Sequence, residues 1–334
     1  RSEAIGDIMA HHTFTPDRYY TSIGWHEPVL HIAPGDSVST TTVDARGRDA
    51  SGEQVCDRGN PMTGPFYIEG AEPGDALVVT FDKLWPNRDW GWTGRTVAPN
   101  VLDPEFVPIV DEPEDMHMIT SHYPDGSQSS DPVCRWDVDF EAGTVHLAKP
   151  HTRLAGLALP MQPMVGCFGV APPRGQAIST ATSSTYGGNM DYRGFVQGVT
   201  VHLPVSAPGA LFYLGDGHAV QGDGEIVGTG VEIPFDVTFS VDVIKDAGVE
   251  WPRGENEIHI FTAGNARPLD QCVQHATTEM LHWLERDWGL DSLSAHQLLG
   301  QCVEYDMGNV YDPAYTMVCK LRKDLLQQLG LQRR

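Results

Sequence analysis

Carboxylates, amides and a histidine crowd a glycine-rich stretch in the second half of this 334-residue chain. Glycine lets the backbone approach another group closely, and carboxylates and imidazole are common ligands of divalent cations. The stretch therefore predicts a metal site, with a glycine- and aspartate-rich hairpin turn as the alternative. Its candidate side chains are Asn189, Asp191, Asp216, His218, Gln221, Asp223, Glu225 and Glu232.

The spacing of these side chains predicts how they would meet. Alternate residues of a β-strand point to the same face, so Asp216 and His218 would share one face. Asp223 and Glu225 repeat this spacing after a glycine-rich turn, and Asp191 would join from another loop. An ion held among them would polarise a carbonyl group and lower the pKa of a bound water. In the alternative, the aspartates cap turns and the histidine bonds to backbone.

Catalysis also needs a base or a nucleophile. A carboxylate left free by the ion, Glu225 or Glu232, would act as general base. Glu69 follows a strand-like run and could point inward or outward. Cys167 lies between glycine-rich neighbours, but no histidine adjoins it in sequence. A buried structural thiol is therefore the favoured interpretation of Cys167, and a nucleophile is the alternative.

The charge balance restricts the partners. The chain has 22 basic and 45 acidic side chains and a formal net charge of −23. This balance repels nucleic acid and anionic lipid, so we expect neither as a partner. No apolar run is long enough to span a membrane. The six cysteines are far apart and form no C-x-x-C pair, which favours reduced thiols and a cytoplasmic protein.

The elements before residue 265 are predicted to be almost entirely β. Two Pro-Gly-Asp turns, at 34–36 and 73–75, each open a strand-like run. Apolar and polar residues alternate over 231–244, which is typical of a half-buried strand. The segment 85–135 is rich in Trp, Pro and Asp but has little periodicity. We expect an irregular insertion there, either a lid over a pocket or a loop anchored by buried indoles.

The pattern becomes helical beyond residue 265. Apolar residues recur at three- and four-residue steps over 269–284, which predicts an amphipathic helix. A capping box that begins at Ser294 predicts the start of a second, shorter helix. The sequence thus predicts a β-rich catalytic core over residues 1–265 and a smaller α+β part over 266–334 that packs on it.

Five blocks of the sequence, taken together and in this order, resemble the acetamidase/formamidase family. They lie at residues 60–65, 69–75, 166–172, 187–191 and 215–225. The last block, GDGHAVQGDGE, is highly specific, and the other blocks are specific in combination. The resemblance extends over residues 22–322.

This resemblance implies that the protein hydrolyses a short amide, like formamide or acetamide, to a carboxylate and ammonia. It implies a mainly β fold with a β-sandwich or barrel-like core and a smaller C-terminal α+β part. It also implies a divalent metal ion, zinc or calcium. Carried onto this chain, it implies metal ligands at His218, Asp191, Asp216 and Asp223, catalytic carboxylates at Glu225, Glu232 and Glu69, and substrate-binding amides at Asn60, Asn189 and Gln221.

Two alternative functions remain open from the sequence. In the first, Cys167 is the nucleophile of the amidase, so that a thiol alkylator stops activity and a chelator spares it. In the second, the chain is a metal-binding β-sandwich protein without catalytic turnover. Exposed sheet edges in an acidic β-rich protein also favour a homo-oligomer, most simply a homodimer.

Overall fold

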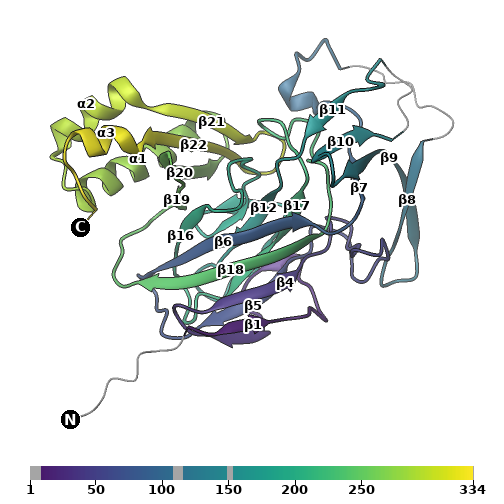
Figure 1. Ribbon diagram of the computed structural model, residues 1–334, viewed down its shortest axis with the longest axis horizontal. Helices are drawn as coiled ribbons and strands as arrows, with labels where there is room; N and C mark the ends of the chain where they lie inside the picture. The colour runs from purple at the N-terminus through teal and green to yellow at the C-terminus, as the bar shows by residue number, and fades with distance from the viewer. Residues whose placement is uncertain (1–8, 108–115, 149–152, 334) are drawn as a thin grey trace.

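The computed structural model describes residues 9–107, 116–148 and 153–333 (Figure 1). The largest sheet of the described chain has nine strands, and its strand order shows that the C-terminal strands extend the same sheet as the N-terminal ones. In spatial order these strands are β1 (His11–Thr13), β4 (Ser37–Thr41), β18 (Phe235–Ile244), β6 (Ala76–Pro86), β16 (Thr200–Pro204), β19 (Arg253–Glu255), β20 (His259–Ala266), β22 (Tyr315–Arg322) and β21 (Glu304–Asn309).

A six-stranded sheet packs against the large one, and a five-stranded sheet stands at one end of the molecule (Figure 1). The six-stranded sheet has the order β14 (Ser183–Ser184), β15 (Gly187–Asn189), β12 (Met164–Gly169), β17 (Phe212–His218), β5 (Thr63–Ile68) and β3 (Leu30–Ile32). The five-stranded sheet contains β11 (Ala158–Pro160), β10 (Thr144–Leu147), β9 (Gln128–Asp139) and β7 (Trp90–Thr93), with β8 (His117–His122) also on β9, and a separate pair joins β2 (Ser22–Ile23) to β13 (Ile178–Ser179).

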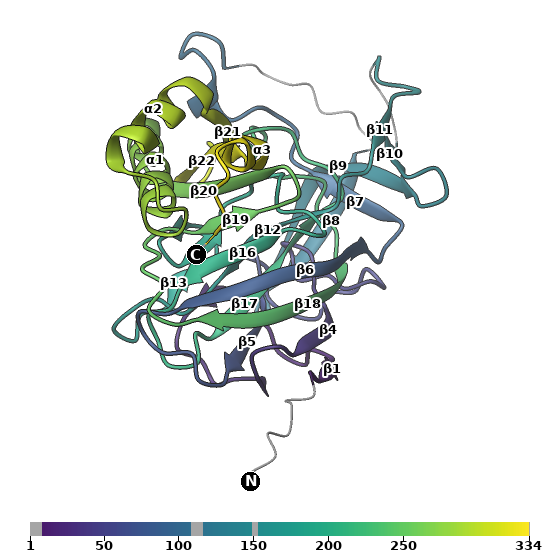
Figure 2. The same ribbon diagram turned by 60° about the vertical axis from the view of Figure 1, so that its left-hand side comes forward.

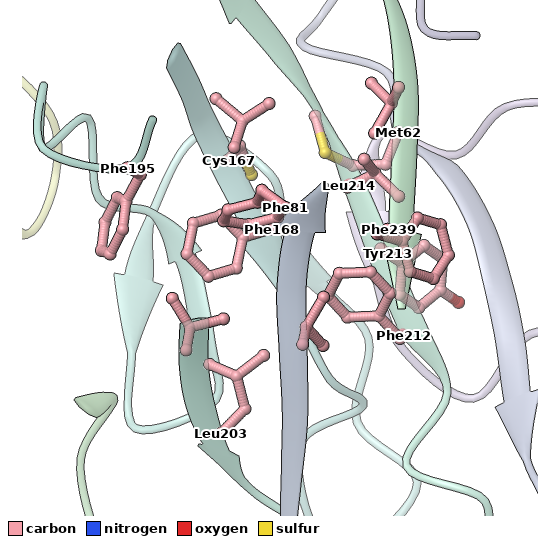
Figure 3. Packing of buried hydrophobic residues seen from close by; sticks show 14 of the residues in the cluster. Met62, Phe81, Cys167, Phe168, Phe195, Leu203, Phe212, Tyr213, Leu214 and Phe239 are labelled. Atoms are coloured by element: carbon pink, nitrogen blue, oxygen red, sulfur yellow. The ribbon is translucent and has the colours of Figure 1, made fainter. Parts of the chain in front are cut away.

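Aromatic side chains fill the space between the two large sheets (Figure 3). Phe81 of β6 meets Phe168 of β12 edge to face, with ring centroids 5.2 Å apart. Phe239 of β18 meets Phe212 of β17 in the same way at 5.3 Å. All four rings are fully buried. The predicted mainly β sandwich-like fold with helices at the C-terminus is confirmed, and its core holds β12 and β17 rigidly in place.

The two Pro-Gly-Asp turns do open strands, as predicted. In each turn the aspartate accepts a hydrogen bond from the N–H three residues before it, Ala33 N to Asp36 at 3.0 Å and Glu72 N to Asp75 at 2.8 Å. The turns lead into β4 and β6, which lie on either side of β18. The similar turns thus build neighbouring parts of one sheet.

The segment 85–135 is more regular than the sequence predicted, because β7, β8 and much of β9 lie in it. Two tryptophan side chains of this segment contact charged side chains of the protein. Trp92 is buried and donates through Nε1 to Asp44 at 3.1 Å, and the guanidinium of Arg88 lies 3.8 Å from the centre of a Trp90 ring. These contacts favour the anchored insertion over the lid, which stays a prediction, since residues 108–115 lie outside the described chain.

The C-terminal part contains α1 (Leu269–Arg286), α2 (Ser292–Cys302) and α3 (Lys323–Gln328), which pack beside β20 and β22 (Figure 2). The N-cap of the second helix lies three residues earlier than predicted. The carboxylate of Asp291 accepts the N–H of Ser294 and is the actual N-cap, so Ser294 lies inside the first turn. Within the described residues, no helix has the length and apolar character needed to cross a membrane.

A buried ion pair ties α1 to β19. Arg253 Nε donates to Glu279 Oε1 at 2.5 Å, and both side chains are almost fully buried. We expect Glu279→Gln to lower the free energy of unfolding by about 3 kcal/mol, because it removes the fully buried one of the two carboxylates that pair with the Arg253 guanidinium and leaves only Asp287 at 3.2 Å. Urea denaturation measures this. Asp324→Asn, which removes an exposed partner of Arg322, should change stability little. Equal effects of the two changes would contradict the prediction.

Candidate functional site

The candidate side chains come from β15, β17, the loops that follow them and the end of β21. Asp216 and His218 are carried by β17, and Asp191 follows β15. Glu225 and Glu232 lie in the long loop between β17 and β18. Three of these acids have left-handed backbones, with φ of 44° at Asp191, 59° at Asp216 and 50° at Glu225. Such conformations cost energy in residues other than glycine and cluster at functional sites.

Four of the predicted side chains converge on Nε2 of His218 or its immediate surroundings. This nitrogen lies 2.9 Å from Glu232 Oε1, 3.4 Å from Asp216 Oδ1 and 3.9 Å from Glu225 Oε1. Asp191 and Glu225 also lie together with His218 as one group of potential ligands. All five side chains are buried. The shared face predicted for Asp216 and His218 is confirmed, although Asp216 departs from extended backbone.

Gln221 fixes the protonation of His218. Its amide nitrogen donates to the backbone carbonyl of Asp191 at 2.5 Å, and its Oε1 lies 2.8 Å from His218 Nδ1. A carbonyl oxygen can only accept, so the Gln221 amide has one orientation, with its oxygen toward the imidazole. His218 Nδ1 must therefore carry a proton. In the neutral ring, Nε2 then presents a lone pair to three carboxylates.

Lone pairs that face one another in a buried site repel one another unless a proton or a metal ion lies between them. Nε2 of His218, Oδ1 of Asp191 and Oε2 of Glu232 are buried without a hydrogen-bond partner among the described residues. Two overlapping sets, Asp191–His218–Glu225 and Asp216–His218–Glu232, each place their ligand atoms within 4.8 Å of one another. Imidazole and carboxylate oxygens are ligands of zinc and similar ions. The donor set therefore fits a divalent metal ion.

The electrostatics of the cluster lead to the same conclusion. Burial, followed by the charges of neighbouring acids, raises the pKa of Asp191 well above its usual value. Burial also raises the pKa of Glu225 well above, and that of Glu232 to about 7, although His218 opposes both shifts. Burial alone would lower the pKa of His218, but the charges of Glu232 and Asp216 outweigh it and raise it. A positive charge at the centre thus stabilises every carboxylate around it.

Gly166 of β12 provides the space in which two of the acids meet. A Cβ atom at this position would collide with Oδ1 of Asp191 and Oδ2 of Asp216. Only glycine lets both carboxylates cross the face of the strand here. The glycine that precedes Cys167 therefore serves the acidic cluster, since it makes room for the two carboxylates.

The structure adds Asn309 and Asp312, which the sequence analysis missed. Asn309 Nδ2 lies 2.6 Å from Asp191 Oδ2 and 2.8 Å from Asp312 Oδ2. Asp312 also accepts from Asn189 Nδ2 at 2.5 Å, and Asn189 Oδ1 accepts from Asn60 at 2.9 Å. The predicted Asn60 and Asn189 thus reach the edge of the cluster. The sequence signal for the missed pair is a short Gly-Asn and Asp-Pro run between two apolar stretches.

Two predicted residues lie away from the cluster. Asp223 is 57% exposed in its side chain and pairs with Arg193 at 2.8 Å. The spacing argument failed for Asp223 because Gly224 and Glu225 both have positive φ, 81° and 50°, so the chain turns between Asp223 and Glu225. Glu69 is 56% exposed and pairs with His31 at 2.8 Å. The structure therefore gives neither a ligand role for Asp223 nor a catalytic role for Glu69.

We expect substitution of these two surface acids to leave activity almost unchanged. Asp223→Asn and Glu69→Gln each remove one charge from an exposed ion pair, which contributes little to stability. In an assay for the amide hydrolysis that the family resemblance implies, initial rates should stay within about threefold of the unaltered protein, because neither side chain reaches the cluster. A loss comparable to that of a cluster residue would contradict this placement.

Cys167 is close to the cluster but is not activated. Its side chain is fully buried (Figure 3), and its Sγ lies 3.7 Å from the carbonyl oxygen of Thr180. Burial, with the charges of Asp216 and Asp191 adding to it, raises the pKa of the Cys167 thiol well above its ordinary value. A nucleophilic cysteine needs a depressed pKa and access to solvent. This geometry favours the structural interpretation of Cys167.

Comparison with known proteins identifies the family of the chain. Residues 10–177 and 174–271 match the model of the Acetamidase/Formamidase family, and Asn309 and Asp312 lie beyond the matched residues. A crystal structure described as an acetamidase from Yersinia enterocolitica superposes with a TM-score of 0.76 at 31% identity, over 96% of this chain and 94% of that one.

Curated relatives are similar over a smaller share of their length. A putative formamidase of Schizosaccharomyces pombe is 27% identical over 66% of this chain and 66% of its own. An acetamidase of Mycolicibacterium smegmatis is 30% identical over 62% of this chain and 59% of its own. The match thus spans slightly less than two thirds of these relatives. Since the family model covers most of the chain, this protein belongs to the acetamidase/formamidase family.

Proposed function

We propose that the protein is an amidohydrolase that cleaves a short, neutral aliphatic amide such as formamide or acetamide to a carboxylate and ammonia. The single observation that carries the proposal is the position of His218 Nε2 among buried carboxylates, 2.9 Å from Glu232 Oε1 and 3.4 Å from Asp216 Oδ1. Gln221 holds Nδ1 of the same ring, which leaves Nε2 to bind a metal ion. Such an arrangement suits a divalent ion, and family membership supports amide hydrolysis as the reaction.

The proposed ligands are His218, Asp191 and Asp216. Zinc is the proposed metal, since an imidazole ligand among carboxylates suits zinc better than calcium, which prefers oxygen ligands alone. When bound, the ion would supply Lewis-acid polarisation of the amide carbonyl and make a nearby water more acidic. The buried side chains of the cluster orient the amide and the water, exclude bulk water and transfer the protons.

Glu232 is the proposed general base. Its Oε2 has no hydrogen-bond partner in the described part of the chain, and burial raises its pKa to about 7 despite the neighbouring His218. A base with a pKa near neutrality is efficient at neutral pH. Glu232 takes a proton from the attacking water as the new C–O bond forms. It passes that proton to the amide nitrogen as the C–N bond breaks, so that ammonia leaves.

Glu225 is the second choice for this role, since Asn309 already occupies its Oε2 at 3.2 Å. Asn60 and Asn189 stay as proposed substrate-binding amides at the edge of the cluster. Gln221, with both ends of its amide engaged, is better suited to holding His218 than to binding substrate. The homo-oligomeric state and the cytoplasmic location expected from the sequence also stay predictions.

A comparison of two inhibitors tests the proposal against its main alternative. We expect dialysis against a strong chelator to abolish ammonia release from formamide and acetamide, and added zinc to restore it. Iodoacetamide should leave the rate within about twofold, because the Cys167 thiol is buried and its pKa is raised. Cys167→Ser should also stay active, because the buried thiol is not the nucleophile. Inactivation of the unaltered protein by the alkylator, together with loss of activity in folded Cys167→Ser and no effect of the chelator, would favour a cysteine nucleophile.

A further inference from the structure

We propose that Asn309 is a positioning residue that gathers the carboxylates of the metal centre, and that the C-terminal part of the chain controls metal loading through it. The inference rests on the proposed function, since it assigns regulation of the same site. Its evidence is the hydrogen bonding of one buried amide and the backbone contacts that deliver this amide to the cluster.

The amide nitrogen of Asn309 contacts three carboxylates at once. Nδ2 lies 2.6 Å from Asp191 Oδ2, 2.8 Å from Asp312 Oδ2 and 3.2 Å from Glu225 Oε2. The amide oxygen accepts the backbone N–H groups of Tyr311 and Asp312 at 2.8 and 2.9 Å. Because backbone N–H groups can only donate, the orientation of the amide is fixed and its nitrogen must face the acids.

The backbone of β21 places this amide by contacting both loops that carry the acids. Gly224 N donates to Met307 O at 3.1 Å, and Val310 N donates to Gly224 O at 2.9 Å, so the strand is tied on either side of Asn309 to the residue before Glu225. On its other side, a Cβ atom at Gly308 would lie 2.8 Å from Met190 O. Glycine at 308 thus lets β21 approach the residue before Asp191.

The Asn309 amide offsets the repulsion among the carboxylates that it contacts. Asp191, Glu225 and Asp312 all lie within 3.2 Å of one amide nitrogen, and like charges held so close in a site with little water repel one another. The two N–H groups of Asn309 are neutral donors, so they bring the acids together without competing for the cation. Without them the carboxylates would turn apart or take up protons, and a metal ion would meet a less organised set of ligands. Loss of an outer-shell partner commonly weakens metal binding by about 10–100-fold.

The test measures zinc affinity directly, by competition with a chromophoric chelator, and compares it with steady-state kinetics at saturating zinc. Asn309→Ser keeps an acceptor for the turn at Tyr311, but its side chain is too short to reach the acids. We expect zinc affinity to fall by about 10–100-fold, and KM for acetamide to stay within about threefold once zinc saturates the protein. Gly308→Ala should weaken zinc binding in the same direction by displacing β21, and a thermal melt checks that each variant is folded.

A matched control is Asn265→Ser on β20, which is separated from β21 by β22. Asn265 is also buried, but its amide bonds Ser184 O and Thr316 rather than the cluster. The Asn265→Ser variant should have a lower thermal stability than the unaltered protein and the same zinc affinity. Unchanged affinity in folded Asn309→Ser, or an affinity loss equal to that of Asn265→Ser, would overturn the inference. A raised KM with unchanged zinc affinity would also overturn it, by placing Asn309 on the substrate. The zinc affinity of the unaltered protein tests the proposed function separately. If the unaltered protein does not bind zinc, the proposed function is wrong.

Discussion

His218→Ala is expected to lower kcat/KM for formamide by more than about 100-fold. Loss of an outer-shell partner typically costs about 10–100-fold, and His218 is itself a proposed ligand, so its loss should cost more. The change removes the nitrogen on which Glu232, Asp216 and Glu225 converge. It also leaves these buried acids without a proton or metal ion held at Nε2, so they repel one another. Initial rates of ammonia release, with metal content measured on the same preparation, test this.

His202→Ala is the matched control for that variant. His202 is buried like His218, but it contacts Glu255 and the ring of Trp283, away from the acidic cluster. Its replacement should lower thermal stability and leave the specific activity of folded protein within about threefold, as for other changes remote from the site. Full activity of His218→Ala would remove the imidazole from the mechanism.

Glu232→Gln is expected to lower kcat by about 10²–10⁴-fold, the usual contribution of a general base. Glutamine keeps the shape of the side chain and one oxygen acceptor, but it cannot take up a proton at neutral pH. If Glu232 acts mainly as base, zinc should still bind, because His218, Asp191 and Asp216 are unchanged. The measurement is kcat for acetamide at saturating zinc, together with the zinc content.

Glu225→Gln is the companion variant, since Glu225 lies in the same cluster at a greater distance from His218. A smaller loss of kcat in this variant than in Glu232→Gln would support the assignment of the base. The reverse order would transfer the role to Glu225. Loss of zinc from Glu232→Gln would instead identify Glu232 as a ligand.

The sequence predicted those parts of the site that local spacing controls. Asp216 and His218 are two residues apart on one strand, and Gln221 follows in the same block, so their proximity needs little tertiary information. The Pro-Gly-Asp turns and the long helix were predictable for the same reason, because turn chemistry and helical periodicity are local. The expectation that Asp191 would join them from another loop came from its residue type and its glycine-rich surroundings, and the family blocks agreed with it.

The remaining features depend on tertiary structure. Asp223 was placed in the cluster because extended backbone was assumed, whereas positive φ at Gly224 and Glu225 turns its side chain out to Arg193. Asn309 enters the cluster only because β21 lies at the edge of the sheet that β20 and β22 extend. The pairing of β19 with β16 and of β20 with β22, which are far apart in sequence, cannot be read from a periodic pattern. For this reason the C-terminal part was predicted as a packed appendage, and its contribution to the site was missed.

Location of the bound cation tests the central claim most directly. Crystals of zinc-loaded protein, measured at the zinc absorption edge, should show an anomalous peak about 2.0–2.1 Å from His218 Nε2, with carboxylate oxygens of Asp191 and Asp216 completing the shell. A competing group of potential ligands exists at Glu250, Glu279 and His282. A peak at that group alone, or none at His218 in protein that releases ammonia from amides, would contradict the account.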